Sequence, residues 1–186
     1  PGIIRHKKKV ALICARMNGY QKRISLALKA WEQIQKHGIA EEWTLKIVGT
    51  GPDLEEYKEL VAQKNIKNIQ FCGRRNPEPY YDEASIFLMT SGPEGWGLTL
   101  TESLQNGVVP VVMNTSPVFE DIITNGYNGF LTRGSRIGDF IKHVLILMED
   151  RRRLEAMQQN ALNSASRFTL ASTMQKWRGI IPPALS

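Results

Sequence analysis

The sequence has no long apolar run that would predict a membrane-spanning helix. None of its apolar stretches approaches the roughly 18 consecutive residues that cross a bilayer. Residues 1–9 carry charges with no apolar core behind them, so the sequence predicts no signal peptide. The first residue is Pro1 rather than Met, and we therefore expect a piece of a longer protein.

Cysteine and histidine are scarce in this sequence. The two cysteines, Cys14 and Cys72, lie in apolar runs and form no CxxC pair, which predicts buried free thiols of a cytoplasmic protein. The three histidines share no metal-ligand spacing with one another or with the cysteines (His6, His37 and His143). The sequence therefore predicts no zinc site.

The charge balance is positive, with a formal net charge of +6. A positive field suits an anionic ligand such as a nucleic acid, an acidic lipid headgroup or a nucleotide phosphate. Basic residues cluster at 7–9 and at 151–153, but neither cluster has the interleaved aromatic residues of a nucleic-acid-binding platform. We expect both clusters to be solvated surface, and we expect no nucleic acid partner.

Short apolar runs alternate with longer amphipathic stretches along the chain. The runs predict strands at 9–14, 44–48, 69–72, 86–89, 109–113 and 129–131. The stretches predict helices at 21–37, 52–63, 79–84, 98–105, 136–149 and 151–166. Continuous apolar strands are typical of a parallel sheet that helices cover on both faces. The sequence thus predicts an α/β fold in one domain, with a Rossmann-like doubly wound parallel sheet of about six strands.

A glycine-rich segment, SGPEGWGLTLTE at 91–102, follows one expected strand and opens a helix. Ligands of doubly wound sheets bind at this edge, and the N–H groups of a helix start attract anionic or hydroxyl-rich groups. Gly95 and Gly97 let a ligand approach the backbone closely. Each carboxylate, of Glu94 and of Glu102, can accept hydrogen bonds from two vicinal hydroxyls, which suits a sugar and a ribose. The alternative is a capping glutamate and an unrelated surface glutamate.

Two cations, Arg16 and Lys22, follow the first expected strand. At a crevice rim they suit a diphosphate, although they also fit two solvated surface charges. The segment GTG at 49–51 begins like the dinucleotide-binding motif GxGxxG. Its third glycine is replaced by Leu54, and Pro52 lacks the N–H that a pyrophosphate would need. This segment therefore argues against a dinucleotide-binding fingerprint.

In this order, the motifs resemble the C-terminal domain of the family-4 retaining glycosyltransferases of the GT-B fold. Glu94 and Glu102, with seven residues between them, match the EX7E signature of that family within the segment EGWGLTLTES. Arg16 and Lys22 resemble its Arg…Lys phosphate clamp. Further family-like segments lie at 48–52, 71–73 and 125–131, so the resemblance covers roughly residues 10–168.

The resemblance implies a donor site for a UDP-, GDP- or ADP-sugar. Arg16 and Lys22 would hold the diphosphate and stabilise the leaving nucleotide, Glu94 would contact the donor sugar, and Glu102 would bind the ribose. Arg16, Lys22 and Glu94 are the implied catalytic residues. The remaining implied contacts join the sugar to the backbone of Gly95, Trp96, Gly97 and Leu98, and the base to Gly73 and Arg74.

The implied reaction is sugar transfer with retention at the anomeric carbon. It needs no cofactor and no obligatory metal, because cationic side chains and helix dipoles take the place of the metal. The sequence departs from the family pattern at Arg23, where a glycine often follows the lysine, and at Trp96, which replaces the usual phenylalanine. Residues 106–110 also carry one residue more than the commonest form. We expect a locally altered clamp loop and a narrower sugar pocket.

The resemblance also implies an N-terminal acceptor domain that this chain does not include. We expect residues 1–9 to be the linker from that domain, residues 10–168 to be the nucleotide-sugar-binding domain, and residues 169–186, with Trp177, to be a tail that packs on the acceptor domain. The chain alone would then bind the donor weakly and transfer nothing. We expect the full-length enzyme in the cytoplasm, with association at the inner face of the membrane left open.

The sequence also leaves other functions open. A nicotinamide-binding oxidoreductase domain shares the fold, but Leu54 speaks against it. A phosphorylase or an epimerase of the GT-B fold is also an alternative, although no feature calls for a lysine-linked pyridoxal phosphate and hydrolytic epimerases lack the EGWGL context. A non-enzymatic interaction module would bind no nucleotide and would be indifferent to Glu102→Ala.

Overall fold

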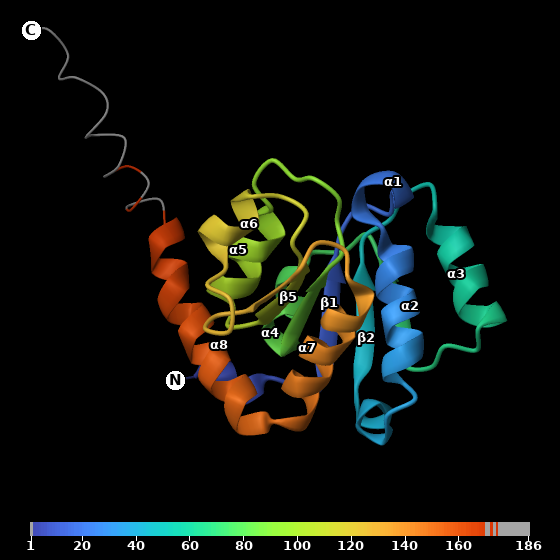
Figure 1. The fold of residues 1–186 in the computed structure, drawn as a ribbon, viewed down its shortest axis with the longest axis horizontal. Coiled ribbons are helices and arrows are strands. Elements are labelled where there is room, and N and C mark those ends of the chain that lie inside the picture. Colours follow the sequence, from blue (N-terminus) through green and yellow to red (C-terminus); the bar gives the residue numbers. More distant parts are fainter. Residues whose placement is uncertain (1, 170–171, 173, 175–186) are drawn as a thin grey trace, which may run out of the picture.

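A computed structural model describes residues 2–169, 172 and 174 of the chain. Its centre is a six-stranded, all-parallel sheet with the order β3-β2-β1-β4-β5-β6 (Figure 1). This confirms the predicted doubly wound sheet. The strands are β1 (Val10–Cys14), β2 (Thr44–Val48), β3 (Ile69–Gly73), β4 (Ile86–Met89), β5 (Val109–Met113) and β6 (Phe130–Thr132).

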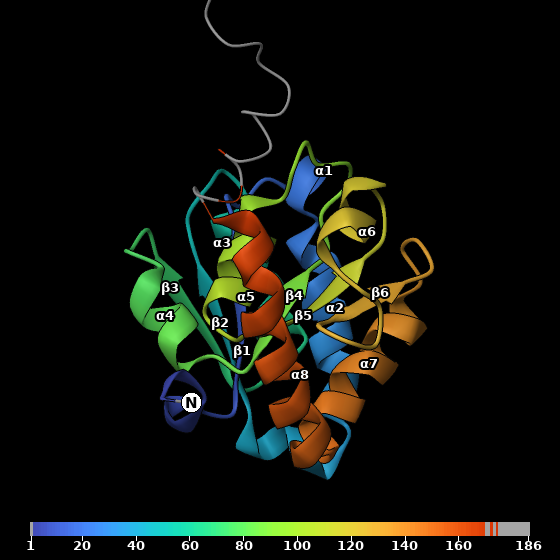
Figure 2. The same ribbon diagram turned by 90° about the vertical axis from the view of Figure 1, so that its left-hand side faces the viewer.

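Helices cover both faces of this sheet, as Figures 1 and 2 show from two sides. Helices α2 and α7 contact each other over one face, and α5 and α8 contact each other over the other. The helices are α1 (Gly19–Lys22), α2 (Ile24–Ile34), α3 (Leu54–Gln63), α4 (Glu78–Glu83), α5 (Leu98–Gln105), α6 (Val118–Ile122), α7 (Ile137–Glu149) and α8 (Arg151–Ala165). Short 3-10 helices lie at Ile3–His6, Gly38–Glu42 and Ser166–Phe168.

Side chains of each strand enter two separate cores in alternation. In β1, Ala11 and Ile13 join the core beneath α2 and α7, whereas Leu12 and Cys14 join the core beneath α5 and α8. A strand in the middle of the sheet that feeds two cores has no solvent-facing side, whereas Gln70 of the edge strand β3 is exposed. Burial on both sides is why β1 is a continuous apolar run in the sequence rather than an alternating one.

The strand order reverses between β1 and β4. Strand β1 pairs with all five residues of β2, but with β4 only at Ala11–Ile86 and Leu12–Phe87. The carboxyl ends of β1 and β4 are therefore not paired with each other. In an open α/β sheet, ligands bind at this point. A small hollow of about 20 Å³ lies there, lined by residues that include Cys14, Lys22 and Thr90.

The structure corrects the helix predicted at 21–37. Two helices occupy this region, α1 and α2, and Arg23 separates them with a φ of 47°, in the left-handed region that a continuous α-helix does not enter. Helix α6 and the 3-10 helices were not predicted, because segments of three to five residues are too short to display a hydrophobic period. The tail predicted at 169–186, with Trp177, lies almost wholly outside the described residues.

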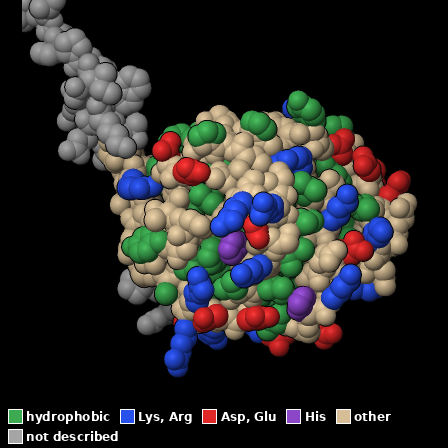
Figure 3. All heavy atoms as spheres, in the orientation of Figure 1, with side chains coloured by type: hydrophobic (Ala, Val, Ile, Leu, Met, Phe, Trp, Pro, Cys, Tyr) green, Lys and Arg blue, Asp and Glu red, His purple; other side chains and the backbone are tan. Residues whose placement is uncertain are grey.

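The surface seen in Figure 3 has Lys and Arg side chains interspersed with acidic ones rather than gathered in one continuous basic stripe. A protein that follows a nucleic acid backbone needs such a stripe or groove. The absence of a nucleic acid partner stays a prediction.

Candidate functional site

The loops after β1 and β2 interlock at the carboxyl edge of the sheet. A Cβ atom on Gly49 would lie 2.0 Å from the carbonyl oxygen of Ala15, and one on Gly51 would lie 2.2 Å from that of Met17. The N–H of Met17 donates a hydrogen bond to the carbonyl of Thr50 at 3.0 Å. The two glycines therefore serve backbone-to-backbone packing, which explains a GTG segment without the rest of a dinucleotide-binding motif.

This packing of the two loops brings Arg16 and Arg74 to the same surface pocket. The pocket measures about 530 Å³ and is lined by Arg16, Thr50, Gly51 and Arg74. Both arginines are exposed, and Gly73 precedes Arg74 with a φ of 69°, where the chain turns away from the end of β3. Two guanidinium groups beside one pocket suit the planar oxygens of a diphosphate. The structure thus brings together two of the predicted residues, Arg16 and Arg74, that lie far apart in the sequence.

Lys22 and Glu94 meet at the point where the strand order reverses, between β1 and β4. The ammonium nitrogen of Lys22, at the end of α1, lies 2.5 Å from Oε1 of Glu94, in the loop between β4 and α5. The side chains are only 21% and 10% exposed, so the pair is largely shielded from water. An anion that binds Lys22 must share the ammonium with Glu94 or displace the carboxylate.

The loop that carries Glu94 is held in place by the loop after β5. The hydroxyl of Thr115 shares its one hydrogen between the carbonyls of Ser91 and Gly92, at 2.8 and 3.1 Å. The hydroxyl of Ser116 donates to the carbonyl of Glu94 at 3.0 Å. These hydrogen bonds satisfy backbone groups that no sheet or helix satisfies. Thr115 and Ser116 were not predicted as part of the site, since nothing in the sequence relates them to Glu94.

The start of α5 presents its backbone at the same edge. Gly97 precedes the helix with a φ of 81°, a conformation that favours glycine, and a Cβ atom on Gly95 would meet no other atom within 4 Å. Leu98 is 68% exposed and Trp96 is 43% exposed. The indole ring of Trp96 packs edge-on against Phe168, with 6.2 Å between the ring centroids. Residues 95, 96 and 98 are therefore exposed at this edge, and Trp96 packs against the 3-10 helix that follows α8.

Glu102, inside α5, is oriented by a buried tyrosine. The hydroxyl of Tyr81, in α4, donates to Oε2 of Glu102 at 3.0 Å, and Tyr81 is only 2% exposed. Burial raises the pKa of the Tyr81 hydroxyl, and the neighbouring Cys14 and Glu102 raise it further, so the phenol stays protonated and remains the donor. Tyr81 was missed because its role depends on the packing of α4 beside α5.

The prediction of two buried thiols is wrong for Cys72. Cys14 is buried, and burial raises the pKa of its thiol to about 12, whereas Cys72 is only partly buried. Cys72 lies in β3, the edge strand of the sheet, where one side has no neighbouring strand to cover it. Its thiol is 3.6 Å from the carbonyl of Gln70.

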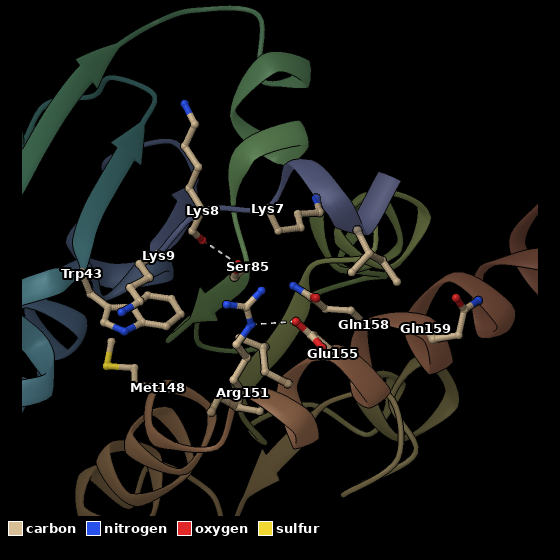
Figure 4. A pocket seen from close by; sticks show the side chains of 13 residues that line it. Lys7, Lys8, Lys9, Trp43, Ser85, Met148, Arg151, Glu155, Gln158 and Gln159 are labelled. Atoms are coloured by element: carbon tan, nitrogen blue, oxygen red, sulfur yellow. Dashed lines mark hydrogen bonds and ion pairs between the residues drawn. The ribbon is translucent and has the colours of Figure 1, made fainter. Parts of the chain in front are cut away.

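The largest hollow described, about 690 Å³, lies at the opposite edge of the sheet and contains none of the predicted site residues (Figure 4). Both basic clusters of the sequence reach it, and several of their charges already have partners. Lys8 pairs with Glu83 at 3.0 Å, and Arg151 pairs with Glu155 at 2.8 Å. Burial lowers the pKa of Lys7 to about 8, so this lysine is not the solvated surface charge that was expected.

Metal ligands do not gather in the part of the chain that the structure describes. Among residues 2–169, 172 and 174, no three His, Cys, Asp or Glu side chains lie close enough together to hold an ion. Independence from a metal stays a prediction. Within the same described ranges, no helix has the length and apolar character needed to cross a bilayer.

A parallel sheet in this order, with cations and carboxylates gathered at its carboxyl edge beside a helix start, defines a Rossmann-like α/β domain. The particular family follows from sequence comparison. Residues 2–164 match the family described as glycosyl transferases group 1, and the chain belongs to this family. Membership gives no support to the alternative of a nicotinamide-binding oxidoreductase.

Individual relatives are similar over most of this chain. An uncharacterized glycosyltransferase of Haemophilus influenzae is 28% identical over 156 residues, which are 83% of this chain and 44% of that protein. The GtfA subunit of a UDP-N-acetylglucosamine–peptide N-acetylglucosaminyltransferase of Streptococcus pneumoniae is 27% identical over 96% of this chain and 37% of that protein. This chain thus spans less than half the length of these relatives.

Solved structures share the fold. The crystal structure of the pneumococcal O-GlcNAc transferase GtfA, in complex with UDP and GlcNAc, superposes with a TM-score of 0.83 at 23% identity. The match covers 94% of this chain and 36% of that one. The likeness confirms the predicted fold, that of one Rossmann-like domain of a GT-B glycosyltransferase.

Proposed function

We propose that this chain is the donor-binding domain of a glycosyltransferase that moves a sugar from a UDP-sugar to an acceptor, with retention at the anomeric carbon. The observation that carries the proposal is the convergence of Lys22 and Glu94, which lie 2.5 Å apart at the reversal point of the sheet. Family membership supports sugar transfer as the reaction. The names of similar proteins, which include UDP, favour uridine over the other bases.

Arg16 and Lys22 provide the positive charge for the donor diphosphate. Negative charge accumulates on the leaving nucleotide as the bond from its phosphate to the sugar breaks. Fixed cations at that place stabilise the transition state more than the ground state, which is the condition for catalysis. A metal ion would otherwise supply this charge, so we propose that the reaction needs neither a metal nor another cofactor.

Glu94 and the backbone of residues 95–98 form the proposed sugar subsite. Once diphosphate oxygens approach the ammonium of Lys22, the Glu94 carboxylate can turn its second oxygen to hydroxyls of the sugar. At the other end of the site, Glu102 accepts hydrogen bonds from the ribose hydroxyls. Gly73 and Arg74 lie beside the base. The positions of these groups along one edge support a donor that is bound from base to sugar.

The acceptor side belongs to the longer protein in this proposal. Residues 1–9 are the proposed linker, residues 10–168 the donor domain, and residues 169–186 a tail toward a second domain that holds the acceptor. We propose a cytoplasmic enzyme because both cysteines are free thiols. Attachment to a membrane surface would be a property of the longer protein.

Calorimetric titration of the chain with UDP, GDP, ADP and their sugars tests the donor assignment. We expect UDP and UDP-sugars to bind, with a dissociation constant raised at least about 10-fold by Lys22→Ala, since a charge-assisted hydrogen bond is lost. Lys29→Ala, which removes an exposed lysine of α2, is the matched control. If neither this chain nor the full-length protein binds any of the nucleotides, the proposal is wrong.

The full-length protein tests the reaction itself. We expect transfer to persist in excess EDTA, and the product to keep the anomeric configuration of the donor, as read from the anomeric coupling constant in NMR spectra. Loss of activity that added Mg²⁺ restores would contradict the metal-free mechanism. A product of inverted configuration would contradict retention.

A further inference from the structure

Arg23 occupies a backbone conformation that is unusual for a side chain of its size. It separates α1 from α2 with φ 47° and ψ 41°, in the left-handed region. Glycine adopts this region without a steric penalty, whereas an L-residue with a Cβ atom does not. An arginine here must be stabilised by contacts that glycine cannot make.

The guanidinium of Arg23 supplies such contacts. Its Nε donates to the carbonyl of Thr90 at 2.9 Å, and its Nη2 donates to the carbonyl of Ser91 at 2.6 Å. Nη1 donates to the hydroxyl of Ser135 at 3.1 Å. Thr90 and Ser91 are each 4% exposed, so these carbonyls are shielded from water. Burial lowers the pKa of Arg23, but a guanidinium stays charged in proteins.

The side chain of Thr90 also contacts the backbone at the junction of α1 and α2. Its hydroxyl lies 3.2 Å from the carbonyl of Lys22 and 3.1 Å from that of Arg23, and its one hydrogen is shared between the two acceptors. The junction of α1 and α2 and the start of the loop at 90–97 are therefore joined reciprocally. Lys22 lies next to Arg23 along the chain, and Ser91 lies three residues before Glu94, so one side chain fixes the backbone on both sides of the Lys22–Glu94 pair.

We propose that Arg23 is a positioning residue for the donor site: it holds the loop at 90–97 against the junction of α1 and α2, and so sets the affinity for the donor. The planar fork of arginine is required, because three donors in fixed directions reach three acceptors on two elements. The part of this inference that concerns affinity rests on the proposed function. The part that concerns the loop does not.

Substitution by glycine separates the two contributions of Arg23. Arg23→Gly relieves the backbone strain while it removes the hydrogen bonds, so we expect the melting temperature to change little. Amide hydrogen exchange in a peptide that covers residues 90–97 should become about 10-fold faster, because buried carbonyls lose their donors. The dissociation constant for a UDP-sugar should rise about 3- to 30-fold.

Two further variants make the test specific. Arg23→Lys keeps the charge but cannot reach all three acceptors, so it should resemble Arg23→Gly in exchange and in affinity. Arg133→Gly removes an exposed arginine of the loop after β6 and should change neither measurement.

Unchanged exchange at 90–97 in Arg23→Gly would overturn the inference. Faster exchange with unchanged donor affinity would overturn the link to the donor site. If the wild-type chain binds no nucleotide, the proposed function fails, and exchange still decides whether Arg23 holds the loop.

Discussion

Lys22 and Glu94 form a shielded ion pair, 2.5 Å between the ammonium nitrogen and Oε1, at the point where the strand order of the sheet reverses. The two residues are 72 positions apart in the chain. A cation that already has a carboxylate partner does not offer its full charge to a ligand. The pair therefore couples the binding of a diphosphate to the position of the carboxylate that would contact the sugar.

The first prediction concerns this coupling. Glu94→Gln frees Lys22 from its negative partner, so we expect UDP alone to bind slightly more tightly than it binds the wild type. The additional affinity that a sugar gives to UDP should be lost, because the carboxylate no longer accepts hydrogen bonds from the sugar hydroxyls. Calorimetry with UDP and with UDP-sugars measures both quantities. Weaker binding of UDP alone by Glu94→Gln would show that the carboxylate does not compete for Lys22.

The second prediction concerns the buried hydroxyl that orients Glu102. Tyr81→Phe removes one hydrogen bond to the carboxylate, and UDP should bind about 3- to 30-fold more weakly, the range for one bond to a charged group in a partly solvated site. Tyr127→Phe, at a tyrosine 47% exposed, is the matched control. A uridine nucleotide without ribose hydroxyls should bind the wild type and Tyr81→Phe equally. A difference that persists with this analogue would contradict the role of Glu102.

The third prediction concerns the interlocked loops. Gly51→Ala places a Cβ atom 2.2 Å from the carbonyl oxygen of Met17, a distance that forces the backbone apart. We expect the free energy of unfolding to fall by at least about 2 kcal/mol, which denaturant titration measures. In contrast, Gly138→Ala in α7 meets no atom within 4 Å and should be neutral or stabilise by up to about 1 kcal/mol. Equal stability of the two variants would refute this account of the GTG segment.

The fourth prediction concerns pH. Burial lowers the pKa of His143, and Lys142 and Arg153 lower it further against the opposing effect of Asp139. The unfolded chain takes up the proton near pH 6.5, before the folded chain does, so stability falls as the pH falls through 6.5. The His143 ring stacks on Phe130, with 4.3 Å between the ring centroids. His143→Phe keeps an aromatic ring at this position but removes the titrating group, so the stability should depend less on pH.

Unfolding titrations between pH 7.5 and pH 5.5 test the effect of His143. His37→Gln, at an exposed histidine, is the control and should retain the pH dependence of the wild type. A dependence that is equally steep in His143→Phe and in the wild type would rule out His143 as its source.

The sequence determined the elements of the sheet almost completely. The predicted strands at 44–48, 86–89 and 109–113 have the bounds of β2, β4 and β5. The continuous apolar runs at 86–89 and 109–113, bounded by turn residues, have one stable environment, a sheet buried on both faces. The carboxyl ends of parallel strands meet at one edge, so the sequence also placed Arg16, Lys22, Glu94 and Glu102 at that edge.

Only the tertiary structure decided which of these residues touch and what supports them. Sequence spacing gives no distance between residues of different elements, so the ion pair of Lys22 with Glu94 and the hydrogen bond of Tyr81 to Glu102 could not be predicted. The left-handed conformation of Arg23 is likewise set by acceptors from two distant loops. Local propensity and hydrophobic pattern depend on neighbours in the chain, and they determine the elements. Hydrogen bonds between loops depend on how those elements pack, and they determine the site.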